Sequence, residues 1–290
     1  MDGQHHSTAV FDWYQGTAFV DHITLRGVLS EAAVGAEWED LERVPHGYGQ
    51  GWRLNDADGR ICDVWAGGTH EHPHFVASGP TAQIVCDLVR SELASRHTVS
   101  RADPCIDFDA PGAYDVLQAE ALQVARDQKV KVGTAGDHLL TMEGRTLYLG
   151  APTSHVRLRL YDKAAELRGK FANMPDVLAT IPDELARLEG QIRPKSPASK
   201  ILAATASPVE MFGSAAWMRV LMGRVAGLDL EPFQAGPVWR KSDDDRAYAA
   251  MLSQYGNLLQ RMRFSLGDAE CVGRQIFDDL AALRHRRGGA

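Results

Sequence analysis

Several features that would assign this chain to a class directly are missing from its sequence. The four cysteines among the 290 residues form no CxxC pair and are widely spaced, so free thiols in a reducing cytosol are expected. No GxxxxGK[ST] loop is present, and ATP hydrolysis therefore has no visible site. The N-terminus carries no secretory signal, and no apolar run approaches the roughly 18 residues that span a bilayer. These absences predict a soluble cytoplasmic protein without membrane contact.

An excess of positive charge is also missing. The chain has 31 Lys and Arg against 38 Asp and Glu, which gives a formal net charge of −7. This balance argues against a protein that coats nucleic acid non-specifically, although it leaves room for a local cationic groove. With 44% hydrophobic residues, the chain is long enough for one large or two small domains.

Strand-like and helix-like segments are mixed along the chain. Hairpin chemistry appears at Gly47–Trp52 and in the Asx- and Gly-rich turn that follows, and Gly79-Pro80 starts an amphipathic helix. Expected strands cover residues 9–23, 60–66, 74–77, 98–109, 130–134, 139–142, 146–149, 157–163 and 185–193, and expected helices cover 25–33, 111–128 and 164–184. The order favours an α+β fold with a largely antiparallel sheet and flanking helices.

The domain boundary is expected near residue 206. Residues 195–208 are rich in Ser, Ala and Pro and are interpreted as a linker or basic loop. Beyond them the pattern is mostly helical, and 269–286 closes the chain with a basic helix. The expected organisation is therefore an α+β domain at 9–206 and a helical C-terminal extension at 207–290.

The most informative segment is Arg157–Lys163, with the sequence Arg-Leu-Arg-Leu-Tyr-Asp-Lys. Because strand side chains alternate between the two faces, Arg157, Arg159, Tyr161 and Lys163 are expected on one face and the leucines on the other. Three cations beside a phenol suit a phosphodiester held next to a nucleophile.

Two other segments also place polar residues at every second position. The first face carries Arg101, Asp103, Cys105, Asp107 and Asp109, and the second carries Arg187, Glu189, Gln191 and Arg193. If all three faces meet, their carboxylates and cations suit phosphoryl transfer assisted by Mg²⁺ or Mn²⁺. Periodicity alone fits equally well a solvated sheet face with cross-strand ion pairs worth about 0.2–1 kcal/mol each.

Two other groups of residues have a rival interpretation. His70, His72 and His74 alternate and could bind Zn²⁺ or Mn²⁺, but the intervening Pro73 favours a surface loop. The indoles of Trp13, Trp52 and Trp65 could stack on unpaired bases, but packing in the core or in the hairpin is favoured.

The polar segments together carry a family resemblance. They occur in the order Thr98-Val-Ser-Arg-Ala-Asp-Pro-Cys-Ile-Asp107, Leu147-Tyr-Leu-Gly150, Ser154, Arg159-Leu-Tyr-Asp-Lys163 and Arg187-Leu-Glu-Gly-Gln-Ile-Arg193. This order resembles the replication initiation factor family, which includes initiators of rolling-circle plasmids and filamentous phages and related relaxases. The resemblance spans roughly residues 9–225. Pro104 departs from the pattern, because the family usually has an apolar residue there, and it predicts a bulge or an edge in that strand.

The resemblance implies an endonuclease that initiates rolling-circle DNA replication in the bacterial cytoplasm. In such an enzyme Tyr161 attacks one DNA strand at the origin, giving a 5′-phosphotyrosine and a 3′-hydroxyl that primes synthesis. The implied roles are phosphate or nucleophile partner for Lys163, divalent-metal ligands (Mg or Mn) for Asp103, Asp107 and Glu189, and DNA contacts for Arg157, Arg159, Arg187 and Arg193. Implied partners are a single-stranded or cruciform nick site, a host helicase and a second copy of the chain.

Two alternatives stay open at this point. A conjugative relaxase would use the same tyrosine at a transfer origin, and a non-catalytic DNA-binding regulator would keep the fold without the chemistry. The presence of Tyr161 and Lys163 favours an enzyme over the regulator.

Overall fold

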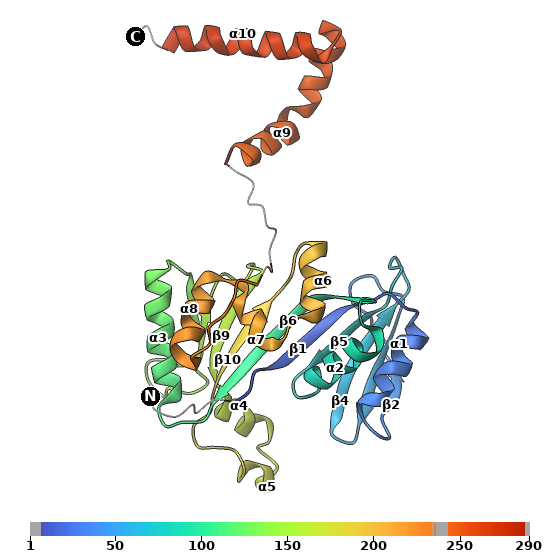
Figure 1. Cartoon of the computed structure of the whole chain (residues 1–290), viewed down its shortest axis with the longest axis vertical. Helices are drawn as coiled ribbons and strands as arrows, with labels where there is room; N and C mark the ends of the chain where they lie inside the picture. The colour runs from blue at the N-terminus through green and yellow to red at the C-terminus, as the bar shows by residue number, and fades with distance from the viewer. Residues whose placement is uncertain (1–6, 234, 236–242, 288–290) are drawn as a thin grey trace. The chain divides into compact units, whose positions relative to one another are not determined.

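The computed structural model of the protein describes residues 7–233, 235 and 243–287, and the chain divides into two compact units. The first unit runs from Met1 to Pro237 and the second from Val238 to Ala290. Figure 1 shows the order of the elements in each unit. Since the placement of the two units relative to each other is not determined, each is described by itself.

A single antiparallel sheet organises the first unit. In the part of the chain that the structure describes, its ten strands have the order β2-β3-β4-β5-β1-β6-β10-β9-β8-β7. The strands are β1 (Val10–Ala18), β2 (Glu37–Asp40), β3 (Gln50–Asp56), β4 (Gly59–Ala66), β5 (His74–Ser78), β6 (His97–Phe108), β7 (Val132–Ala135), β8 (Thr146–Leu149), β9 (Val156–Asp162) and β10 (Ala186–Ile192). Every neighbouring pair is antiparallel, so the expected α+β fold with an antiparallel sheet is confirmed.

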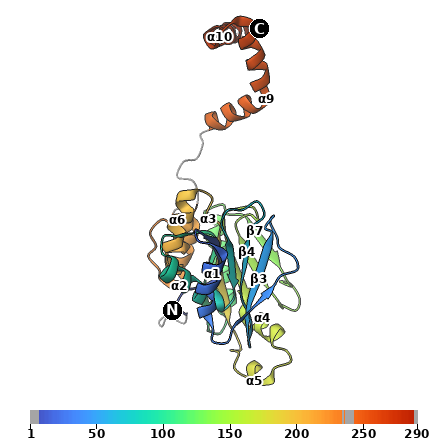
Figure 2. The same ribbon diagram turned by 90° about the vertical axis from the view of Figure 1, so that its right-hand side faces the viewer.

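Most helices of the first unit cover one face of this sheet. They are α1 (His22–Leu29), α2 (Thr81–Leu93), α3 (Ala113–Asp127), α6 (Pro197–Thr205), α7 (Pro208–Met211) and α8 (Ala216–Ala226), with the short 3₁₀ turns η1 (Ser30–Ala32) and η2 (Phe212–Ser214). Figure 2 shows α1, α2 and α6 on one side of strands β3, β4 and β7 of the sheet. On the opposite face, called the open face below, lies α4 (Lys163–Lys170), which is followed along the chain by α5 (Pro175–Leu178).

Residue alternation in β9 explains why the sheet has one apolar and one polar face. Leu158 and Leu160 are fully buried in the core beneath the helices, whereas Arg157 and Arg159 are half-buried on the open face. Fully burying a leucine stabilises the fold by about 1.5–3 kcal/mol, so this orientation of the strand is strongly preferred over its reverse.

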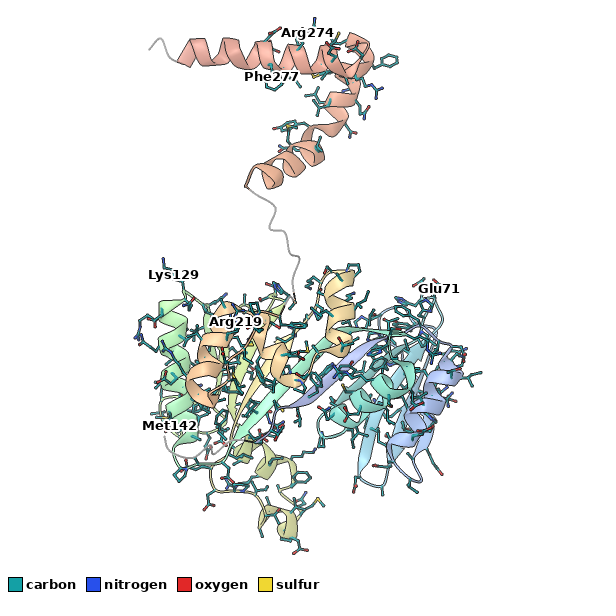
Figure 3. The ribbon with its side chains drawn as sticks, viewed as in Figure 1. Glu71, Lys129, Met142, Arg219, Arg274 and Phe277 are labelled. Atoms are coloured by element: carbon teal, nitrogen blue, oxygen red, sulfur yellow. The ribbon has the colours of Figure 1, made fainter. Side chains whose placement is uncertain are left out.

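Two local expectations were wrong. Helical spacing predicts Ile84 on the buried stripe of the helix after Pro80 together with Val85, Val89 and Leu93, but Ile84 is 46% exposed on α2 while the other three are buried. The expected strand at 139–142 is a loop in which the carboxylate of Asp137 accepts hydrogen bonds from the three following backbone amides, 139 to 141. An Asp side chain that caps successive amides in this way replaces strand pairing. Met142, labelled in Figure 3, closes this loop with a φ of 58°.

Most of residues 195–208 form the helix α6 (Pro197–Thr205) and not a linker. Ser196 caps α6, and Ser199 Oγ accepts a hydrogen bond from the Ser196 backbone amide, while proline occupies the first turn. Ala203 and Ala204 are buried against the sheet. The Ser and Pro residues therefore start a helix, which is the other common role of this composition.

The first unit also continues beyond the expected boundary at residue 206. Phe212, Met218, Leu221 and Met222 are fully buried in the same hydrophobic core as the sheet. Since α7, η2 and α8 bury their apolar side chains on this core, the compact unit extends to Pro237.

The second unit consists of α9 (Asp243–Leu266) and α10 (Ala269–Arg287), which contact each other. Gly267 separates them with a φ of 95°. Phe277, labelled in Figure 3, projects from α10 and is 73% exposed. In the described parts of the chain, no helix combines the length and the apolar character that crossing a membrane requires.

Candidate active site

The strand register brings the three polar segments together on the open face. Arg187 of β10 lies between Tyr161 of β9 and Asp107 of β6, and Glu189 lies between Arg159 and Cys105. The meeting of the three polar faces that periodicity suggested is therefore confirmed.

A bulge in β1 adds an acid that the sequence analysis missed. The register with β6 shifts between Phe11, which pairs with Pro104, and Trp13, which pairs with Asp103, so Asp12 is the extra residue. Pro104 thus lies in an inner strand beside a bulge and not at an edge. The only signal in the sequence is that Asp12 interrupts an otherwise apolar and aromatic run from Val10 to Tyr14.

The guanidinium of Arg187, on β10, bonds to carboxylates on two other strands, Asp107 on β6 and Asp12 on β1. Its Nε and Nη2 donate to the two oxygens of Asp107 at 2.5 and 2.7 Å, and its Nη1 donates to Asp12 Oδ1 at 2.6 Å. Burial opposes its charge, but the hydrogen bonds and charge of Asp107 prevail and hold the pKa of Arg187 above its ordinary value. Each of the three guanidinium nitrogens therefore donates to a carboxylate oxygen of the protein.

Tyr161 is held between cations and one carboxylate. Its hydroxyl donates to Glu189 Oε2 at 3.3 Å, and the same oxygen accepts from Arg159 Nη2 at 2.6 Å. The Arg159 guanidinium lies 4.2 Å from the centre of the Tyr161 ring and Lys163 Nζ lies 5.6 Å from it. The phenol has cations over its ring and a proton acceptor at its hydroxyl.

Burial sets the protonation of this pair. Burial first, and then the negative charge of Glu189, raise the pKa of Tyr161 above its ordinary value, against the opposing charges of Arg187 and Arg159. Burial likewise raises the pKa of Glu189, although Arg159 opposes the shift. The resting phenol is therefore protonated, and Glu189 is the group in contact that can accept its proton.

Lys163 differs from the expectation in one respect. It is the first residue of α4 instead of the last residue of the strand, because Asp162 caps that helix by accepting from the Ala165 amide. Lys163 is 9% exposed, and its Nζ bonds to Glu166 Oε2 at 2.7 Å. It nevertheless stays beside the Tyr161 ring.

Two hollows lie near the tyrosine. One of about 600 Å³ lies between α4 and the open face, and its lining includes Asp12, Trp13, Arg101, Asp103, Asp107, Arg159, Lys163, Glu166, Arg187 and Glu189. The other, of about 760 Å³, is lined by residues that include Arg145, Arg159, Tyr161, Glu166 and Arg168. Tyr161 lines the second hollow, while its partners Glu189 and Lys163 line the first, and Arg159 and Glu166 border both.

The three carboxylates expected to bind a metal are each bonded to a different arginine. Asp107 bonds to Arg187 and Glu189 to Arg159, while both Asp103 oxygens accept from Arg101 Nε at 3.0 Å. Burial, opposed by Arg101, raises the pKa of Asp103 to about 7. Among the described residues, no group of three or more His, Cys, Asp or Glu is arranged to hold a metal ion. In this arrangement the three acids do not fit a joint ligand set, although their oxygens are of the type that Mg²⁺ prefers.

The candidate histidines and tryptophans pack against other aromatic rings or against an arginine. His70 stacks on Tyr48 with ring centres 3.9 Å apart, and His74 stacks on Trp65 at 5.5 Å. Burial lowers the pKa of His74 to about 4. Trp52 is buried, but Trp13 is half-buried on the open face with the Arg101 guanidinium 4.2 Å from its ring.

Comparisons with known proteins agree with this fold. No family model matches the sequence, and no curated protein matches it. The chain is similar to a solved structure described as a rolling circle replication initiator protein from Geobacillus stearothermophilus, with a TM-score of 0.51 and 18% sequence identity. The alignment covers 78% of this chain and 98% of that one. At this identity the likeness shows a shared fold.

Proposed function

We propose that this chain is a rolling-circle DNA replication initiator that nicks and rejoins one DNA strand through Tyr161. The observation that supports it best is that the Tyr161 hydroxyl is bonded to Glu189, that Arg159 and Lys163 lie over its ring, and that the residue lines a hollow of about 760 Å³. The fold shared with a replication initiator supports the same choice.

The proposed reaction is a transesterification. Tyr161 Oη attacks the scissile phosphorus while its proton passes to Glu189 Oε2, and the bond from phosphorus to the 3′-oxygen breaks. The 3′-oxygen leaves as a hydroxyl after taking up a proton from Lys163 Nζ, 5.6 Å from the centre of the tyrosine ring, because the nearer guanidinium of Arg159 does not give up a proton. The strand then carries a 5′-phosphotyrosine, and rejoining reverses the same steps without ATP.

The surrounding cations have two different proposed roles. Arg159 and Lys163 would offset the charge that develops on the phosphate, because both lie next to the phenol. Arg187 would position the strands and bind little DNA, because Asp12 and Asp107 neutralise it. Dependence on Mg²⁺ or Mn²⁺ stays a prediction drawn from the family resemblance.

The deciding experiment compares Tyr161→Phe with the parent on a supercoiled plasmid that carries the origin. The variant is expected to bind DNA with the parent's affinity and to lose both nicking and the covalent adduct. Tyr255→Phe is the matched control, because Tyr255 lies on α9 and is 47% exposed. A covalent adduct in Tyr161→Phe, or an adduct mapped by mass spectrometry to another tyrosine, would overturn the assignment. Absence of any adduct in the parent would favour a DNA-binding regulator.

Metal dependence is tested separately on the parent. Nicking is expected to stop in excess chelator and to return with added Mg²⁺ or Mn²⁺. Full activity in chelator would exclude a metal requirement and leave the tyrosine assignment intact.

A further inference from the structure

Three arginines lie close together next to the candidate site and share a single acidic partner. Arg101 of β6, Arg193 just after β10 and Arg157 of β9 come from three adjacent strands on the open face. The register places Arg193 beside Arg101, because Ile192 pairs with Ala102, and the Arg193 amide bonds to the carbonyl of His155. Among the described residues, the three arginines form an ion pair with a single acid, Asp103, which bonds to Arg101.

Buried donor groups in this cluster lack acceptors. Arg157 Nε and Arg193 Nη1 are buried in the protein without a hydrogen-bond partner. Burial, together with the nearby charges of Arg101 and Arg157, lowers the pKa of Arg193 against the opposing charge of Asp103. Water or a bound anion satisfies buried donors of this kind, and an anion would also offset the like charges that lie close together here.

Two of these guanidinium groups are held in place by aromatic rings. Arg157 lies 3.8 Å from the centre of the Tyr148 ring, and Arg101 lies 4.2 Å from that of Trp13. Stacking of this kind fixes the donors before a ligand arrives, which lowers the entropy lost on binding.

We propose that Arg101, Arg157 and Arg193 form a phosphate anchor for a non-scissile phosphate of the strand that Tyr161 cleaves. The proposal rests on the proposed function. Arg157 precedes Tyr161 by four residues in one strand, about 13 Å at roughly 3.3 Å per residue. That distance corresponds to about four nucleotides in duplex geometry, at about 3.4 Å each, and to fewer in an extended strand. Arg159 and Arg187 are excluded from the anchor, because Glu189, Asp12 and Asp107 already neutralise them.

The experiment uses the full chain and origin oligonucleotides in which one phosphate at a time is replaced by a neutral methylphosphonate. Binding is measured in the Tyr161→Phe background, so that cleavage does not interfere. One replacement, within two to four nucleotides of the nick, is expected to weaken binding about tenfold. The same replacement is expected to have no effect in Arg157→Met or Arg193→Met. Each arginine variant is also expected to reduce the slope of log affinity against log salt by about 0.7.

Arg96→Met is the matched control, because Arg96 is exposed between α2 and β6 and its guanidinium donates to the Glu92 carbonyl, away from the candidate site. It is expected to keep the methylphosphonate effect. A second readout is stability, because removal of one of several like charges should leave the urea midpoint of Arg157→Met and Arg193→Met unchanged or higher. Persistence of the tenfold effect in both anchor variants would overturn the proposal, as would a marked loss of stability in both. Failure of the parent to cleave DNA would instead count against the proposed function, while the binding arm would still test the anchor.

Discussion

Replacement of Glu189 by Gln tests how the tyrosine loses its proton. Glu189 Oε2 lies 3.3 Å from Tyr161 Oη, within reach for direct proton transfer. A glutamine keeps the shape and can still accept from Arg159, but it cannot take up the proton. Loss of a general base reduces rates by about 10²–10⁴-fold, which adds about 2.7–5.4 kcal/mol to the barrier at about 1.36 kcal/mol per tenfold.

The pH profile distinguishes a base from a purely structural residue. In the parent, the cleavage rate should rise with pH as Glu189 loses its proton and then level off above its raised pKa. In Glu189→Gln the rate should keep rising about tenfold per pH unit, because only the small tyrosinate fraction reacts and burial holds the Tyr161 pKa above its ordinary value. The glutamine also removes the negative charge that contributes to that shift.

The assay is single-turnover cleavage of an origin oligonucleotide between pH 5.5 and 9.5, with the urea midpoint as a check of folding. Glu166→Gln is the matched control, because this half-exposed acid bonds to Lys163 and not to the phenol. Its rate should fall less than tenfold. If Glu189→Gln cleaves within tenfold of the parent and keeps the parent's pH profile, Glu189 is not the base.

Two further predictions concern stability. Arg187→Met leaves Asp12 and Asp107 without their cation, although both side chains are about three-quarters buried. The free energy of unfolding, measured in urea at pH 7, should therefore fall by about 3–5 kcal/mol. An unchanged urea midpoint would contradict the bridging role. Asp103 has a folded pKa of about 7 against a usual value of 3.8, so the folded protein binds the extra proton between these limits. The parent's stability should therefore fall as pH rises from about 4 to 7, by up to about 1.4 kcal/mol per unit. Asp103→Asn should remove that slope from urea titrations over the same range.

The proposed site combines charges that are satisfied within the protein with charges that are not. Arg187 and Arg159 have their carboxylates, and they organise the strands around the tyrosine. Arg159 also has a buried Nε without an acceptor, but Arg157 and Arg193 have such donors without an ion pair to a described acid, and we assign them to DNA. This difference between arginines of similar sequence pattern appears only when their partners are known.

The sequence by itself determined the faces of the strands. Residue alternation in 157–163 and 187–193 sends leucine and isoleucine into the core, and burial of those side chains leaves the arginines, Tyr161 and Glu189 on the other face. The hairpin at 50–66 and the helix after Pro80 also followed from local chemistry, because turn residues and proline constrain the backbone directly.

Tertiary structure decided what local patterns could not. The Asp137 loop and the α6 helix have compositions that suit more than one conformation. Local hydrogen bonds of Asp137 and Ser196 hold the two segments, and burial of Ala203 and Ala204 in the core also favours the helix. The position of Asp12 depends on a bulge that forms only when β1 pairs with β6, 90 residues away along the chain. Likewise, the pairing of each carboxylate with one arginine depends on the register of four strands, because charge alone is compatible with many pairings. The chain therefore encodes which residues share the open face, and the folded sheet decides which of them remain free for a phosphate.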